Sequence, residues 1–247
     1  MITKSEVKYI QSLGHKKFRD ELKQFTAEGP KIIIELLNSP SILLKALYAT
    51  EEWWNVNKDV YESLAPGMAI EIKEYELEKI SALSTPNQVM GIFHQPIYDK
   101  VTSFNNCISL MLDGIQDPGN MGTIIRIADW FGAEYIIASE ESAEIYNPKV
   151  VQATMGSIGR VQVIYDDLLR LIKAIPAVPI YAASLEGKDI TEYKKITEGI
   201  ILIGNESKGI QVPLLQSATH QVTISKRGKA ESLNAAVAAG IILSHLV

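Results

Sequence analysis

Three short polar segments, each placed directly after an apolar run, hold the residues whose types could support chemistry. They are DGIQDPGNMG (113–122), GNESKG (204–209) and SKRGKAESLN (225–234). In the first, Asn120 could cap a helix, and the same helix start could also receive an anion such as a phosphate or a sugar oxygen. In the second, Glu206 presents a carboxylate, although a plain surface turn would have the same composition. A buried terminal helix preceded by a basic, solvated loop would have the same composition as the third segment.

A single cation, Arg126, stands among the isoleucines of TIIRIADWF. Its aliphatic stem is expected to pack while its guanidinium reaches a polar opening. Two kinds of partner fit this position. One is an ion pair with Asp129, three residues further along a helix. The other is a phosphate or a substrate oxygen.

The elements that must position these residues fall into two groups. Residues 2 to about 26 are compatible with one or two helices, a further helix is predicted from Pro30 to Asn38, and β-like runs at 44–50 and 89–96 flank helical segments. We expect a small α/β domain over residues 1–98 and a join near 97–106.

Beyond that join, over residues 104–247, strands alternate with helices. This rhythm predicts an α/β fold with a mostly parallel sheet and helices on both faces. Ligands of such sheets bind beyond the carboxyl ends of the strands. The three polar segments follow predicted strands, so they are the places where a ligand site is expected.

Composition narrows the classes of function. The chain has 247 residues, 47% of them hydrophobic, and a formal net charge of −5, so any RNA contact must use local basic patches. A single cysteine, Cys107, excludes an intramolecular disulfide, and the four histidines lack zinc-site spacing, so no metal is expected. No apolar run reaches the length of a membrane span and the start lacks a signal-peptide pattern, so a cytoplasmic protein without a membrane partner is expected.

Taken in order, DPGNMGTIIRIADWFG, IGNESKGI and ISKRGKAESLNAAVAAGI resemble the motifs of the SpoU (TrmH) family of RNA methyltransferases, within the SPOUT superfamily. The segment NPKVVQATMGSIGR is similar to the family's connecting segment, and the amino-terminal half looks like the substrate-binding domain that precedes many members. The resemblance implies a carboxyl-terminal SPOUT domain with a deep trefoil knot. It also implies a homodimer with S-adenosylmethionine bound in the knot and each site completed across the interface.

The resemblance further implies roles for individual residues. The cofactor-binding positions are Gly204, Ile224 and Leu233, with Ser184 and Leu185 as additions. The catalytic positions are Asn120, Arg126, Glu206, Ser232 and Asn234. A protonated arginine cannot be a base, so Arg126 is expected to hold phosphate and to stabilise the developing alkoxide. Hydrogen bonds of Asn120 and Glu206 are expected to hold the site together, while Ser232 and Asn234 organise the last loop.

The implied activity is methyl transfer from S-adenosylmethionine to a ribose 2′-hydroxyl. The extra amino-terminal domain favours ribosomal RNA over transfer RNA. Two basic groups are candidates for RNA binding, although solvated surface charge would have the same composition. They are Lys16, Lys17 and Arg19 in the first domain, and Lys226, Arg227 and Lys229 beside the site.

Three alternatives are kept beside this activity. A transfer RNA 2′-O-methyltransferase is one alternative. A non-catalytic RNA-binding member of the same fold is the second, although the presence of Asn120, Arg126, Glu206 and Asn234 argues against it. A small-molecule enzyme using a nucleotide cofactor is disfavoured, because neither GxxxxGK[ST] nor GxGxxG is present. The runs Ser225-Lys226-Arg227 and Lys229-Ala230 depart from the family pattern, which affects the expected loop shape and substrate choice.

Overall fold

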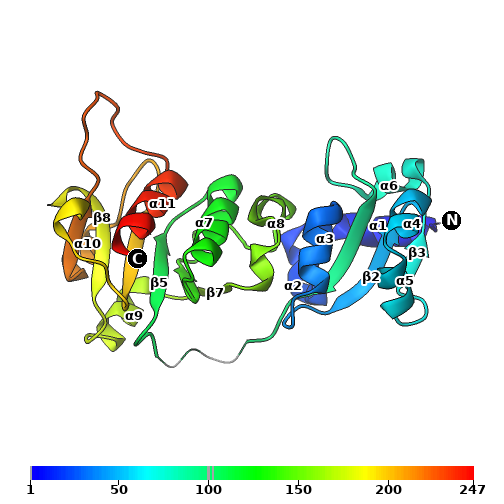
Figure 1. Cartoon of the computed structure of the whole chain (residues 1–247), viewed down its shortest axis with the longest axis horizontal. Coiled ribbons are helices and arrows are strands. Elements are labelled where there is room, and N and C mark those ends of the chain that lie inside the picture. The colour runs from blue at the N-terminus through cyan, green and yellow to red at the C-terminus, as the bar shows by residue number, and fades with distance from the viewer. Residues whose placement is uncertain (1, 99–100, 102) are drawn as a thin grey trace. The chain divides into compact units, whose positions relative to one another are not determined.

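Two sheets organise the chain, and each belongs to a separate compact unit (Figure 1). The computed structural model describes residues 2–98, 101 and 103–247. The first unit comprises Met1–Ile97 with Tyr146–Arg160, and the second comprises Tyr98–Ile145 with Val161–Val247. None of the helices in the described ranges is long and apolar enough to cross a membrane.

The first unit is a small α/β unit around a four-stranded sheet of order β1-β4-β2-β3. Strand β4 pairs antiparallel with β1 and β2, and β2 pairs parallel with β3. Its elements are α1 (Lys4–Ser12), α2 (Lys16–Leu22), β1 (Gln24–Glu28), α3 (Pro30–Leu37), β2 (Leu44–Ala49), α4 (Glu51–Val56), α5 (Lys58–Ser63), β3 (Ala69–Glu71), α6 (Glu74–Ile80) and β4 (Val89–His94).

The predicted helix from Pro30 to Asn38 is confirmed, with Pro30 in the first turn and Asn38 as the C-cap. The expectation of helix up to residue 26 is wrong, because Lys23 adopts a left-handed conformation that ends α2 and the chain continues as β1. All five residues of β1 are buried, and Phe25 pairs in register with Phe93 of β4. Tertiary pairing thus overrides the local helical spacing.

The second unit is built on a six-stranded sheet of order β10-β8-β9-β5-β6-β7 in which every pair of neighbours is parallel. This confirms the predicted α/β class with a parallel sheet. Its elements are β5 (Ile108–Asp113), α7 (Pro118–Trp130), β6 (Tyr135–Ala138), β7 (Gln162–Tyr165), α9 (Leu168–Ala174), β8 (Ile180–Asp189), η2 (Ile190–Glu192), β9 (Gly199–Gly204), α10 (Val212–Ser217), β10 (His220–Thr223) and α11 (Ala235–Leu246).

The parallel arrangement brings the polar segments to one edge of this sheet. Asp113 at the end of β5 is in register with Gly204 at the end of β9, so the first two segments are neighbours. Strand β10 runs parallel to β8, and the third segment follows its end. The three strand ends singled out in the sequence therefore lie along one edge of the sheet.

Helix α8 (Pro148–Thr154) and the short helix η1 (Ser157–Gly159) lie between two strands of the second unit in sequence, yet they pack within the first unit. The aromatic rings of Tyr146 and Phe25 lie 4.8 Å apart between centroids. The sequence-based boundaries, 1–98 and 104–247, assigned this segment to the second domain, and they stay a prediction. The predicted join near 97–106 includes residues 99, 100 and 102, which lie outside the described residues.

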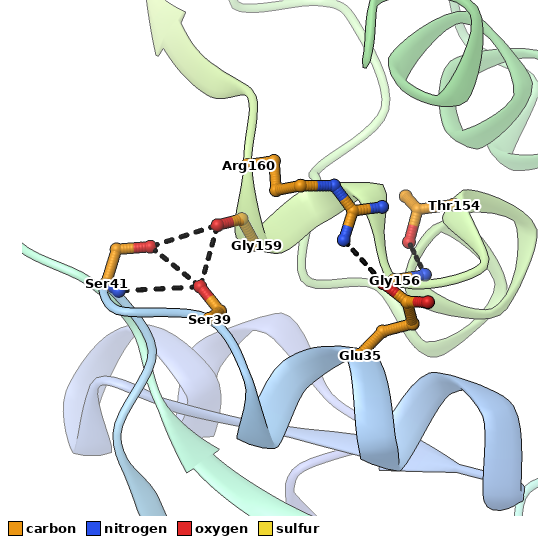
Figure 2. Close-up of polar contacts among 7 residues, drawn as sticks. All are labelled: Glu35, Ser39, Ser41, Thr154, Gly156, Gly159 and Arg160. Atoms are coloured by element: carbon orange, nitrogen blue, oxygen red, sulfur yellow. Dashed lines mark hydrogen bonds and ion pairs between the residues drawn. The ribbon is translucent and has the colours of Figure 1, made fainter. Parts of the chain in front are cut away.

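Figure 2 shows how the segment is fastened to α3 and the loop after it. Arg160 forms an ion pair with Glu35, with 2.6 Å between Nη1 and Oε2. The carbonyl oxygen of Gly159 accepts hydrogen bonds from Ser39 Oγ at 2.7 Å and from Ser41 Oγ at 3.1 Å. At Gly156 the backbone has φ +97°, and a Cβ would lie 2.4 Å from the Cβ of Glu35. Glycine is therefore required for this close approach.

Candidate functional site

A cavity of about 990 Å³ opens at the carboxyl edge of the six-stranded sheet. It is lined by the middle of β8, the end of β9 and the loop after it, the segment from β10 to the start of α11, and one face of α11. The cavity has the size of a small-molecule site, and its place at the strand ends is typical of α/β folds. All five residues predicted to bind the cofactor line it: Ser184, Leu185, Gly204, Ile224 and Leu233.

The backbone around Gly204 folds back tightly on itself. Asn205 and Gly209 exchange two backbone hydrogen bonds, 3.1 Å from Asn205 N to Gly209 O and 2.9 Å from Gly209 N to Asn205 O. A Cβ at position 204 would lie 2.4 Å from the carbonyl carbon of Gly209 and from the amide nitrogen of Ile210. Only glycine fits here without moving the loop that lines the cavity.

The same loop is hydrogen-bonded to the end of β5. The buried carboxylate of Asp113 accepts two hydrogen bonds from Gln211, one from the backbone nitrogen and one from Nε2, both at 2.7 Å. Asn205 Nδ2 donates to the carbonyl oxygen of Gly114 at 2.7 Å. Asp113 and Gln211 were missed by the sequence analysis. A carboxylate that ends the apolar run ISLML is the signal that could have found Asp113.

A continuous chain of side-chain hydrogen bonds joins all three polar segments. Asn120 Nδ2 donates to Glu206 Oε1 at 2.6 Å, and Asn234 Nδ2 donates to Asn120 Oδ1 at 2.8 Å. One amide at the start of α7 therefore bridges the second and third segments. The arrangement satisfies both ends of the Asn120 side chain and makes the position of each loop dependent on the other two.

Asn120 lies in the first turn of α7, whereas Asn234 directly precedes α11. The expected capping role of Asn120 is wrong, because the N-cap of α7 is Asp117, whose Oδ1 accepts from Asn120 N at 2.8 Å. This leaves the Asn120 side chain available to the site. Asn234 is the N-cap of α11, and its Oδ1 accepts from the backbone nitrogens of Ala236 and Val237.

Arg126 lies away from the cavity of its own chain. Its side chain is exposed on α7 and does not line the cavity, so the expectation of a packed stem and a head at a polar opening is not met within a single chain. The alternative ion pair with Asp129 stays a prediction. Ser232, by contrast, lines the cavity and is exposed.

The predicted basic groups have unequal exposure. Lys226 and Arg227 are exposed and line the cavity, and Lys229 is exposed beside it. In the first unit, Lys16 and Lys17 are exposed.

Arg19 does not belong to a surface patch. Its side chain is only 2% exposed, and Nη1 donates to the carbonyl oxygen of Leu13 at 2.9 Å. The prediction that Arg19 contacts RNA is therefore wrong, because a buried guanidinium that bonds to the backbone has a structural role. Across the described part of the chain, no three His, Cys, Asp or Glu side chains come together as a metal site would need.

Comparison with known proteins gives consistent matches. The model of the "SpoU rRNA Methylase family" matches residues 107–244, and that of the "MRM3-like substrate binding domain" matches residues 4–91. The 23S rRNA (guanosine(2553)-2′-O)-methyltransferase RlmP of Bacillus subtilis is 29% identical, over 98% of this chain and 95% of that protein. The crystal structure of an AdoMet-bound rRNA methyltransferase from Sinorhizobium meliloti has a TM-score of 0.87 and 33% identity, covering 100% of this chain and 95% of that one.

Proposed function

The chain belongs to the SpoU rRNA methylase family, and on this premise we propose that it transfers a methyl group from S-adenosylmethionine to a ribose 2′-hydroxyl of ribosomal RNA. The family predicted from the three motifs is confirmed, as is the substrate-binding domain before them. The observation that carries the proposal is the hydrogen-bonded chain of Glu206, Asn120 and Asn234 at the rim of the cavity. As an enzyme of ribosomal RNA, the protein is proposed to act in the cytoplasm.

The residues of the cavity fit S-adenosylmethionine, which supplies the sulfonium methyl group when it is bound. Gly204 lets the backbone approach closely, and the apolar side chains of Ile224 and Leu233 can flank an adenine ring. Ser184 and Leu185, in the middle of β8, also line the cavity. We assign the cofactor to this cavity because the same loops are fixed by Asp113 and by Asn120.

In the proposed reaction, Arg126 holds an RNA phosphate and stabilises the negative charge that develops on the ribose oxygen. It remains protonated and is not the base. The amides of Asn120 and Asn234 and the carboxylate of Glu206 fix the loops beside the cavity, and Ser232 lines the same cavity. Lys226, Arg227 and Lys229 supply local positive charge for RNA.

Arg126 can take this role if a second copy of the chain places it at the neighbouring cavity. We therefore propose a homodimer through α7 and α11. The surface of these helices supports this, because Trp130 is 84% exposed and Val237 is 50% exposed. Apolar exposure of this kind on packed helices is typical of an interaction surface. The trefoil knot is proposed with it, formed by the carboxyl-terminal segment that lines the cavity.

The experiment is methyl transfer from labelled S-adenosylmethionine to total RNA from cells that lack this protein, with the modified nucleotide mapped. We expect 2′-O-methylation of ribosomal RNA by the wild type and its loss in Arg126→Ala. Arg170→Ala is the matched control, since Arg170 is an exposed arginine on α9 whose ion pair with Asp166 lies at the surface. Cofactor binding without transfer to any RNA would contradict the proposal and favour a non-catalytic binder.

A further inference from the structure

A second cavity lies in the first unit, between β1, the residues after α6, and α8. Its volume is about 290 Å³, and it shares no lining residue with the cavity of the second unit. Residues 26–28 and 82–83 belong to the stretch matched by the substrate-binding domain, whereas residues 148–153 belong to the stretch matched by the methylase family. We call this cavity the β1–α8 pocket. Neither family match by itself contains the whole of it.

The walls of the β1–α8 pocket are mainly small and apolar. They are formed by Ala27, Ala82, Leu83, Pro148 and Ala153. Short aliphatic side chains of this kind leave flat surfaces that can cover the faces of an aromatic ring. An apolar pocket with a few polar groups is the usual composition of a small-ligand site.

The carboxylate of Glu28 is a buried polar group in the wall of the pocket. This residue is only 5% exposed, and burial raises the pKa of its carboxyl group. Ser81 Oγ donates to Oε2, and the backbone nitrogen of Ala82 donates to Oε1 at 2.8 Å. Each carboxylate oxygen can accept a second hydrogen bond, so Glu28 keeps acceptor capacity toward the pocket.

Thr26 of β1 is a second buried polar residue of the pocket, and two further polar side chains come from α8. Lys149 is exposed at its rim and forms no ion pair with Glu28, and Gln152 is partly buried. Their position depends on the contacts that fasten residues 146–160 to the first unit, including the Glu35–Arg160 ion pair (Figure 2). The fastened segment thus completes a pocket with an acceptor inside and a cation at the entrance.

We propose that the β1–α8 pocket binds one unstacked guanine base of the RNA substrate, with Glu28 accepting from the base edge and Lys149 contacting an adjacent phosphate. This inference rests on the proposed function. Single-stranded bases are read in this way, by burial of the ring face and hydrogen bonds to the edge. A carboxylate only accepts, and guanine alone among the four bases presents adjacent N1–H and N2–H donors. Adenine, cytosine and uracil each place an acceptor beside their donor.

The direct test is a nuclear magnetic resonance titration of the full chain with GMP, IMP and AMP. We expect GMP to bind roughly tenfold more tightly than the other two, because one well-placed edge contact discriminates by about that factor. Glu28→Gln should abolish the preference, and Lys149→Ala should weaken binding of all three nucleotides. Glu21→Gln on the exposed face of α2 is the matched control. The proposal would be overturned if GMP and AMP bound equally well, if neither bound, or if the variants bound the nucleotides as the wild type does.

Circular dichroism checks that Glu28→Gln is folded. Gln152→Ala is tested beside it as a second variant of the pocket. With ribosomal RNA as substrate, we expect the pocket variants to raise the KM for RNA with unchanged cofactor affinity and unchanged kcat at saturating RNA. An unchanged KM would overturn the claim that this pocket reads the substrate. If GMP binds as expected but the wild type transfers no methyl group to RNA, the proposed function fails while the guanine pocket stands.

Discussion

The side-chain amide of Asn120 donates a hydrogen bond of 2.6 Å to the carboxylate of Glu206, a residue 86 positions later in the chain. The other end of the same amide accepts from Asn234 at 2.8 Å. A helix start, a strand end and a helix cap are thereby fixed against one another. The cavity lies beside this contact, so the effect of replacing these residues on cofactor binding and methyl transfer can be measured.

Replacing Asn120 with alanine removes both hydrogen bonds at once. We expect the rate of methyl transfer to fall roughly 10- to 100-fold, because small displacements of positioning groups have effects of that size. The measurement is single-turnover methyl transfer at saturating cofactor. Thr123→Ala, an exposed position on the same helix, is the control and should retain activity. A rate for Asn120→Ala equal to that of the control would show that the bridge is dispensable.

Asp113→Ala should loosen the loop that lines the cavity. Loss of two hydrogen bonds to a charged acceptor is expected to lower the free energy of unfolding by about 1.5–3 kcal/mol and to weaken cofactor binding. Asp113→Asn should be milder, since its amide can still accept from Gln211 N and donate to a rotated Gln211 side chain. Denaturant unfolding and calorimetric titration with S-adenosylmethionine report both effects. Equal losses of stability and cofactor binding in the two variants would show that the hydrogen bonds between Asp113 and Gln211 are not the cause.

Gly204→Ala and Gly228→Ala form a matched pair within one cavity. The added methyl at 204 would meet the backbone of Gly209 and Ile210 at 2.4 Å, whereas at 228 it would meet nothing within 4 Å. We therefore expect Gly204→Ala to lose cofactor binding and Gly228→Ala to keep it. Equilibrium dialysis with labelled S-adenosylmethionine is the measurement. Retained binding in Gly204→Ala would remove this loop from the cofactor site.

Mixed dimers test whether Arg126 acts across an interface. Arg126→Ala and Gly204→Ala should each be inactive alone, because the first lacks the phosphate-holding cation and the second the cofactor loop. Mixing them should restore part of the activity, since one cavity of a mixed dimer has a normal loop and an arginine from the other chain. Co-expression with two different affinity tags isolates the mixed species. Inactivity of that species would place Arg126 and the cavity on the same chain.

The buried phenol of Tyr48 predicts an alkaline loss of stability. Burial, with smaller contributions from Glu6 and Tyr9, raises its pKa to about 12. The unfolded phenol ionises near pH 10, so the stability due to this group is complete below about pH 10 and is lost as the pH rises toward 12. Urea unfolding between pH 9 and 12 should show a shallower decline in Tyr48→Phe than in the wild type. Tyr75→Phe, at an exposed position, is the control and should decline as the wild type does.

The sequence by itself determined the class of fold and the three polar segments. Alternating apolar strands and helices are a local pattern, and in a parallel sheet they place all strand ends at one edge. The resemblance of these segments to the SpoU motifs then implied one site for Asn120, Glu206 and Asn234 before their hydrogen bonds were known. The five cavity residues followed from the same motifs.

Tertiary structure decided what local pattern does not encode. Asn120 bridges two loops only because Asp117 takes the capping position, and Arg19 is buried although its neighbours Lys16 and Lys17 are exposed. Strand β1 forms because β4 pairs with it. Residues 146–160 lie in the first unit because Glu35 forms an ion pair with Arg160, and Ser39 and Ser41 donate hydrogen bonds to Gly159. The bridges made by Asn120, the pairing of β1 with β4 and the contacts of residues 146–160 all join residues far apart in the chain. Spacing within a segment carries no information about such partners.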